Sequence, residues 1–141
     1  MKPLTVPGKL ESLDSVATYV LQAASHAGLD YRTSYRLRLA VDEIATNIIL
    51  YGLDEVGSVG TITMLAEMDE VYLTIHIEDT GTGYNPSEAL PPDQVRGPVK
   101  TRKLGGWGIY LAMWGVDQFQ YSRVRERNRS TFKVQRPFKY H

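Results

Sequence analysis

The chain has 141 residues, 43% hydrophobic and 23% charged, as expected of one globular domain spanning residues 1–141 rather than a disordered or fibrous chain. It contains no cysteine, which excludes disulfide frameworks and thiolate sites, and no apolar run reaches the ~18 residues of a membrane span, so we expect a cytoplasmic protein without membrane attachment. The formal net charge is zero, which argues against direct binding of nucleic acid, because that affinity depends on neutralising many phosphates.

Helical periodicity dominates the first third of the chain. Apolar residues recur at helical spacing over residues 10–27, and Gly28 is placed to end this helix. Asp30 is a suitable N-cap for a second helix, of about twenty residues, that Gly52 would close. Its apolar side chains are spaced four, three, four and three residues apart: Leu37, Val41, Ile44, Ile48 and Tyr51. The pattern predicts two helices that each bury one face.

Strand patterns follow the helices. Residues 61–67 and 71–78 flank a short acidic turn and predict an antiparallel hairpin. Residues 84–104 hold four of the seven prolines and little periodicity, which predicts a long irregular connection of the kind that is usually functional. An apolar segment at 109–116 predicts a short helix.

A second hairpin is predicted at the end of the chain, from residues 117–125 and 131–136 around a connection at 126–130. The order of elements predicts an α+β fold. We expect a two-layer sandwich in which helices cover one face of a mostly antiparallel β-sheet.

A carboxylate and a carboxamide lie one turn apart on the second predicted helix. Glu43 and Asn47 share a direction about 100° from the centre of the apolar stripe, at the margin of the buried face where a cleft can form. Together they could hold a hydrated Mg²⁺, or one could hold the metal while the other polarises a water or a hydroxyl. The alternative is an ordinary pair of helix-surface side chains.

An acid followed by alternating glycines ends the second predicted strand. Asp79 is followed by Gly81 and Gly83, which would let a ligand approach the backbone closely while the carboxylate accepts a hydrogen bond from an amino group. The alternative is a glycine-rich turn in which the aspartate bonds only to its own backbone.

Three further glycines, Gly105, Gly106 and Gly108, open the predicted helix at 109–116. Glycines at a helix N-terminus present backbone N–H groups and the positive end of the helix dipole to an anion. Four basic side chains lie just upstream and could fold over a polyphosphate: Arg96, Lys100, Arg102 and Lys103. The alternative is a loop-to-helix junction with solvated charges.

The order of these three motifs resembles the N, G1 and G2 boxes of the GHKL ATP-binding superfamily. The matching residues are Glu43-x-x-x-Asn47, Asp79-x-Gly81-x-Gly83 and Gly105-Gly106-x-Gly108. The compact size is most similar to the anti-sigma factor serine/threonine kinase branch, the RsbW-like proteins. The resemblance covers about residues 10–136 and implies the Bergerat ATP-binding fold.

The resemblance also implies roles for the first two boxes. By matching position, Glu43 would be the general base for the attacking hydroxyl and Asn47 the Mg²⁺ ligand. Asp79 would accept a hydrogen bond from the adenine amino group, in a pocket shaped by Gly81 and Gly83.

For the remaining positions the resemblance implies contacts with the rest of ATP. Residues 84–104 would form the ATP lid, and Thr131 would support the adenine from the final strand. Phosphate binding is implied for Lys103, Gly105, Gly106 and Gly108.

The leading hypothesis is therefore a Mg²⁺- and ATP-dependent serine/threonine protein kinase. By resemblance it would phosphorylate a STAS-domain anti-anti-sigma protein in a partner-switching circuit, could also sequester a sigma factor, and could form a homodimer. One alternative is an ATP-gated protein-binding module without significant kinase activity. Another is a stand-alone histidine-kinase-like ATPase domain, which would transfer phosphate to histidine.

Overall fold

The computed structural model describes residues 1–53, 60–81 and 115–137, together with the side chains of all these residues except 51–53. In this part of the chain five strands form one antiparallel sheet, in the order β1-β2-β3-β5-β4. The strands are β1 (Leu4–Pro7), β2 (Thr61–Met68), β3 (Tyr72–Asp79), β4 (Gln118–Val124) and β5 (Arg127–Gln135).

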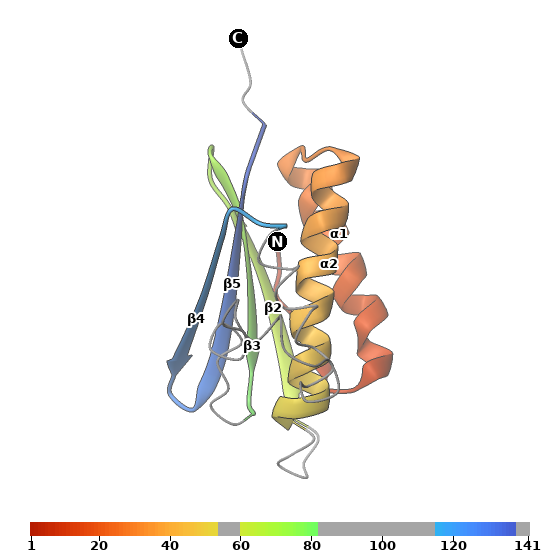
Figure 1. The fold of residues 1–141 in the computed structure, drawn as a ribbon, viewed down its shortest axis with the longest axis vertical. Helices are drawn as coiled ribbons and strands as arrows, with labels where there is room; N and C mark the ends of the chain where they lie inside the picture. Colours follow the sequence, from red (N-terminus) through yellow and green to blue (C-terminus); the bar gives the residue numbers. More distant parts are fainter. Residues whose placement is uncertain (54–59, 82–114, 138–141) are drawn as a thin grey trace, which may run out of the picture.

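Two helices, α1 (Leu13–Ala27) and α2 (Tyr31–Asn47), cover one face of this sheet (Figure 1). A 3₁₀ turn at Leu10–Ser12 precedes α1, and a π-helical turn at Ile48–Leu53 follows α2. The predicted α+β arrangement of helices on one face of an antiparallel sheet is confirmed. None of the helices in the described ranges is long and apolar enough to cross a membrane.

The predicted boundary between the helices is also confirmed. Gly28 follows α1 with a φ of 78°, a left-handed conformation that glycine adopts without strain. Asp30 caps α2, where its Oδ1 accepts a hydrogen bond from the Thr33 N–H at 2.7 Å. The same hydrogen bond lowers the pKa of Asp30.

The core lies between the helices and the sheet. Its largest fully buried side chains come from both layers: Phe132, Leu37, Ile44, Ile62, Met64, Leu73, Ile75, Ile77, Val16, Val20 and Val41. Phe132 meets Phe119 edge to face, with 5.1 Å between ring centroids. Two leucines of the first predicted helix do not join the core, because Leu10 and Leu21 are 51% and 41% exposed.

The N-terminal strand β1 was not predicted from the sequence. It is four residues long, ends at Pro7 and forms one edge of the sheet by pairing with β2. The hydroxyl of Tyr19 joins α1 to β2 and to the segment just before β1: it accepts from the Ala66 N–H at 3.0 Å and donates to the Lys2 carbonyl at 2.9 Å. Because β1 is short and ends in a proline, it limits pairing of this sheet edge with another chain.

Tyr19→Phe is expected to lower the free energy of unfolding by about 1–3 kcal/mol, because the buried Ala66 N–H then loses its partner. Urea denaturation measures this change. Tyr72→Phe is the matched control on the outer face of the sheet and is expected to be close to neutral. Equal stabilities of the Tyr19 variant and the wild-type protein would contradict the bridging role.

The closing hairpin differs from the prediction in its turn. The structure turns at Arg125 and Glu126, whose φ angles are 51° and 66°, so that β5 already begins at Arg127. Positive φ at both central residues is the geometry of the tight two-residue turn that fits the twist of paired strands. The predicted connection at 126–130 is therefore wrong, because most of it lies within β5.

Candidate functional site

The first two predicted boxes come together at one end of the molecule. Figure 1 shows the C-terminal end of α2, the C-terminal end of β3 and the β4–β5 turn at this same end. Asn47 is the last residue of α2, and Asp79 is the last residue of β3. In the chain β2 lies between α2 and β3 and pairs antiparallel with β3, and Figure 1 shows that α2 and β3 finish at the same end of the molecule.

Asn47 carries a buried oxygen that no described residue satisfies. The residue is 2% exposed, and its Nδ2 donates to the Glu43 carbonyl at 2.8 Å. Because a carbonyl can only accept, the amide nitrogen must face Glu43, which sets the position of Oδ1. This Oδ1 is buried and receives no hydrogen bond. A buried oxygen without a hydrogen bond lowers the free energy of unfolding by about 1–3 kcal/mol. Its presence therefore indicates a ligand that this oxygen would bind.

Glu43 lies one helical turn before Asn47 and is half-buried. Its neighbour Asp42 forms an ion pair with Arg38, with 3.3 Å between Oδ2 and Nε. Burial raises the pKa of Asp42, while Arg38 opposes that rise. No ion pair joins Glu43 to another described residue, so its carboxylate is available to accept a proton or a hydrogen bond.

Asp79 is buried at the end of β3, with 3% of its surface exposed. Its Oδ1 accepts two hydrogen bonds, from the Gly81 N–H at 2.8 Å and from Asn128 Nδ2 at 3.0 Å. Burial raises the pKa of Asp79, and the bonds from Asn128 and Gly81 partly offset that rise. None of the described residues donates to Oδ2, which leaves this carboxylate oxygen available to accept a hydrogen bond from a ligand.

Three side chains of the β4–β5 hairpin extend this cluster. Asn128 Oδ1 accepts hydrogen bonds from the Tyr121 hydroxyl and from Arg123 Nη1, the latter at 2.8 Å. Arg123 Nη1 also lies 3.2 Å from the Gly81 carbonyl, to which it donates. No sequence motif pointed to these residues, although correct placement of the turn would have put Asn128 opposite Asp79.

Thr131 does not share a face of the sheet with Asp79. It pairs with His76 on the side away from the helices, where its Oγ1 lies 2.9 Å from His76 Nδ1. Burial is the main cause that lowers the pKa of His76. The residue of β5 on the Asp79 face is Ser130, which is 2% exposed. The strand alternation therefore places Ser130, rather than Thr131, on the face of the sheet that carries Asp79.

The remaining predicted site residues lie outside the described ranges. This holds for Gly83 and for the whole predicted lid at 84–104, which includes Lys103. It also holds for the glycines of the third box: Gly105, Gly106 and Gly108. Gly81 is described and contributes both its N–H and its carbonyl to the Asp79 cluster.

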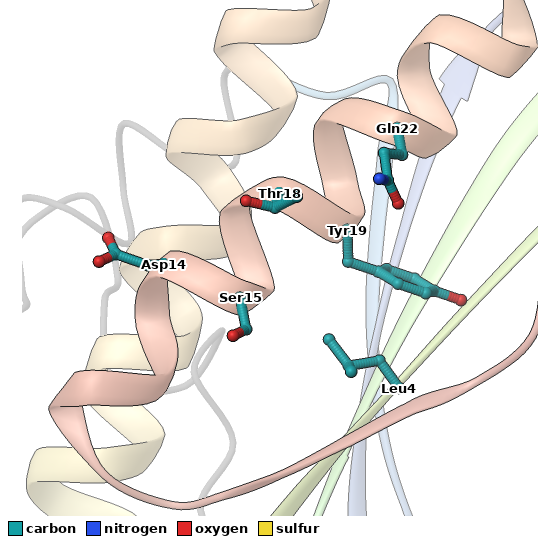
Figure 2. A pocket seen from close by; sticks show the side chains of 6 residues that line it. All are labelled: Leu4, Asp14, Ser15, Thr18, Tyr19 and Gln22. Atoms are coloured by element: carbon teal, nitrogen blue, oxygen red, sulfur yellow. The ribbon is translucent and has the colours of Figure 1, made fainter.

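A separate hollow lies beside α1. It has a volume of about 340 Å³ and is lined by Leu4, Asp14, Ser15, Thr18, Tyr19 and Gln22. Figure 2 shows these six side chains. None of these residues belongs to the three predicted boxes, of which the first lies on α2 and the second begins at the end of β3. The hollow is therefore not part of the candidate site.

Asp79→Asn is expected to raise the melting temperature of the nucleotide-free protein by about 2–4 °C at pH 7. Burial raises the pKa of Asp79 above its usual 3.8, so the ionised group destabilises the folded state increasingly as the pH rises above that value. Asparagine keeps an oxygen for the same two hydrogen bonds without the charge. Thermal unfolding at pH 7 and near pH 4 measures the gain, which should shrink at the lower pH. A lower melting temperature of the variant at both values would contradict this account.

Known proteins share both the sequence pattern and the fold. The family model described as "Histidine kinase-like ATPase domain" matches residues 6–133. Serine-protein kinase RsbW of Bacillus mycoides is 27% identical over 83% of this chain and 74% of its own length. RsbW of Halalkalibacterium halodurans is 29% identical over 83% and 72%. Serine/threonine-protein kinase BtrW of Bordetella bronchiseptica is 29% identical over 77% and 78%.

Solved structures agree at the level of the fold. The RsbU and RsbW domains of Rv1364c from Mycobacterium tuberculosis align with all of this chain, with a TM-score of 0.64 and 15% identity. This chain spans 35% of that longer one. The histidine kinase domain of EL346 from Erythrobacter litoralis aligns with 92% of this chain and 61% of its own, with a TM-score of 0.55 and 17% identity.

Proposed function

The chain belongs to the histidine kinase-like ATPase family, which implies ATP binding, and we propose that it is a Mg²⁺-dependent serine/threonine protein kinase of the anti-sigma type. Its substrate would be a STAS-domain anti-anti-sigma protein in a partner-switching circuit of the cytoplasm. The relatives named RsbW and BtrW, at 25–29% identity, support this branch of the family.

The observation that carries the proposal is the buried Oδ1 of Asn47, which has no hydrogen-bond partner among the described residues. Mg²⁺ bound with a nucleotide usually takes only one or two oxygens from the protein and the others from phosphates and water. A single amide oxygen, held in place by the bond from Nδ2 to the Glu43 carbonyl, fits that requirement. The described residues contain no cluster of three acidic, histidine or cysteine side chains that would hold a metal without the nucleotide.

The proposed chemistry depends on the turn of α2 that carries Glu43 and Asn47. Bound Mg²⁺ would neutralise charge on the transferring phosphate. Glu43, whose carboxylate forms no ion pair with another described residue, would accept the proton of the incoming serine or threonine hydroxyl. The amide of Asn47 would keep its oxygen toward the metal, because its nitrogen is occupied by the Glu43 carbonyl.

At the other side of the site, Asp79 would bind the base of ATP. Its Oδ2 has no donor among the described residues and could accept from the 6-amino group of adenine. Gly81 and Gly83 would let the base approach the backbone. Ser130 of β5, on the same face of the sheet as Asp79, would support the adenine. We assign phosphate contacts to the lid and the third box, namely Lys103, Gly105, Gly106 and Gly108.

Phosphate transfer from ATP to a STAS-domain protein of the same organism tests the proposal. The kinase should phosphorylate this partner on serine or threonine, giving a product that survives acid. Acid-labile label would instead indicate transfer to histidine. Partner affinity that changes with ATP while no phosphoprotein forms would indicate an ATP-gated binding module.

A further inference from the structure

The hairpin residue Asn128 ties β5 to the end of β3 through its side-chain amide. Its Nδ2 donates to Asp79 Oδ1 at 3.0 Å, and its Oδ1 accepts from Tyr121 and Arg123. With donors on one end of the amide and a carboxylate on the other, only one orientation of the amide satisfies all three partners. Asn128 is 3% exposed, so these bonds form away from competing water.

The same cluster holds the backbone that follows Asp79. Arg123 Nη1 donates both to Asn128 Oδ1 and to the Gly81 carbonyl, and the Gly81 N–H donates to Asp79 Oδ1. The four groups form a closed ring of hydrogen bonds that spans β3, β4 and β5. Both described donors to Asp79 bond to Oδ1 and hold that oxygen in place, while Oδ2 has no donor among the described residues.

We infer that Asn128 is a positioning residue that sets the nucleotide selectivity of this protein, by turning Asp79 so that Oδ2 meets the 6-amino group of a purine. Arg123 and Tyr121 support it from the far side of the amide. This inference rests on the proposed role of Asp79 in binding adenine. An acceptor on a side chain that is only 3% exposed favours a base with an amino donor over one that lacks it, because the oxygen would then have no donor in the complex.

Two nucleotides separate this role from a general structural one. ATP carries the 6-amino group, whereas purine riboside triphosphate carries hydrogen at the same position and is otherwise the same ligand. In Asn128→Ala, the affinity for ATP is expected to fall about tenfold or more, the loss typical of a hydrogen bond to a charged group. The affinity for purine riboside triphosphate is expected to change by less than about twofold on the same scale. Calorimetric titration of the full chain with each nucleotide measures both constants.

Two further variants complete the design. Asn128→Leu keeps a similar side-chain volume, so it removes the amide without the packing loss that alanine could cause. It should show the same selective loss of ATP affinity. Arg129→Ala is the matched control, because it removes the neighbouring side chain of β5 and its 2.7 Å ion pair with Glu78 on the opposite face. This control should keep the wild-type ratio of the two affinities.

Equal weakening of both nucleotides in folded Asn128 variants would overturn the inference, since it would indicate only structural damage. An unchanged ATP affinity would overturn it as well. Asp79→Ala distinguishes this failure from failure of the proposed site. If Asp79→Ala loses ATP selectivity while the Asn128 variants keep it, the proposed role of Asp79 stands and only the inference fails. If Asp79→Ala binds both nucleotides as the wild-type protein does, the proposed role of Asp79 fails and the inference fails with it.

Discussion

Glu43→Gln is expected to slow phosphate transfer to a protein hydroxyl by about 10²- to 10⁴-fold, the range typical for loss of a general base. The amide has nearly the shape of the carboxylate but cannot take up the hydroxyl proton. ATP binding should persist, because the Asn47 amide bonds to the backbone carbonyl of Glu43 and not to its side chain. Initial rates with saturating ATP and partner protein measure the effect.

Asp42→Asn is the matched control for this substitution. It removes a carboxylate from the adjacent position of α2, but that carboxylate is paired with Arg38 at 3.3 Å and has no proposed part in transfer. We expect its rate to stay within about threefold of the wild-type rate, a difference of less than about 1 kcal/mol. If both variants lost the same factor in transfer rate, the negative charge of this helix, rather than a general base at Glu43, would account for the effect.

Asn47→Leu is expected to abolish the stabilisation of the protein by Mg²⁺ and ATP together. At a ligand concentration 100 times the dissociation constant, the wild-type protein should gain about 2.7 kcal/mol. This gain corresponds to a rise of about 5–10 °C in the melting temperature of a chain of this size. Leucine has a similar volume but no oxygen, so the variant should show little or no Mg²⁺-dependent rise.

The same variant should not be destabilised without nucleotide. The Oδ1 of Asn47 is buried without a hydrogen bond, and its removal eliminates that unfavourable group. A melting temperature equal to or above that of the wild-type protein is therefore expected in the absence of ligand. A large loss of stability in this state would show that the amide has a structural role instead. Thr46→Ala, at the neighbouring half-buried position, is the control and should keep the response to Mg²⁺ and ATP.

The sequence was most informative where periodicity was strong. The apolar stripe of α2, the caps at Gly28 and Asp30 and the alternation in β3 predicted the helix pair and the central hairpin. The direction shared by Glu43 and Asn47 also predicted their place at the edge of the buried face, where the structure has one half-buried and the other buried. These features depend on local spacing, which the sequence records directly.

The sequence was less informative where tertiary contacts decide the structure. Strand β1 has only four residues and ends at Pro7, and its pairing with β2 depends on a partner almost sixty positions away. The turn at Arg125 and Glu126 has no glycine or asparagine at its centre, so nothing local marked it. The error in this turn had one consequence for the site: Asn128, which the true register pairs with Asp79, went unnoticed.

The most direct test of the account is to identify the phosphorylated residue on the partner. A STAS-domain protein is incubated with Mg²⁺, ATP and either the wild-type chain or Glu43→Gln, and the product is mapped by mass spectrometry after acid treatment. The account predicts phosphate on a single serine or threonine with the wild-type chain, and almost none with the variant although it still binds ATP. Phosphate on histidine, or no phosphoprotein despite binding of both ATP and the partner, would contradict it.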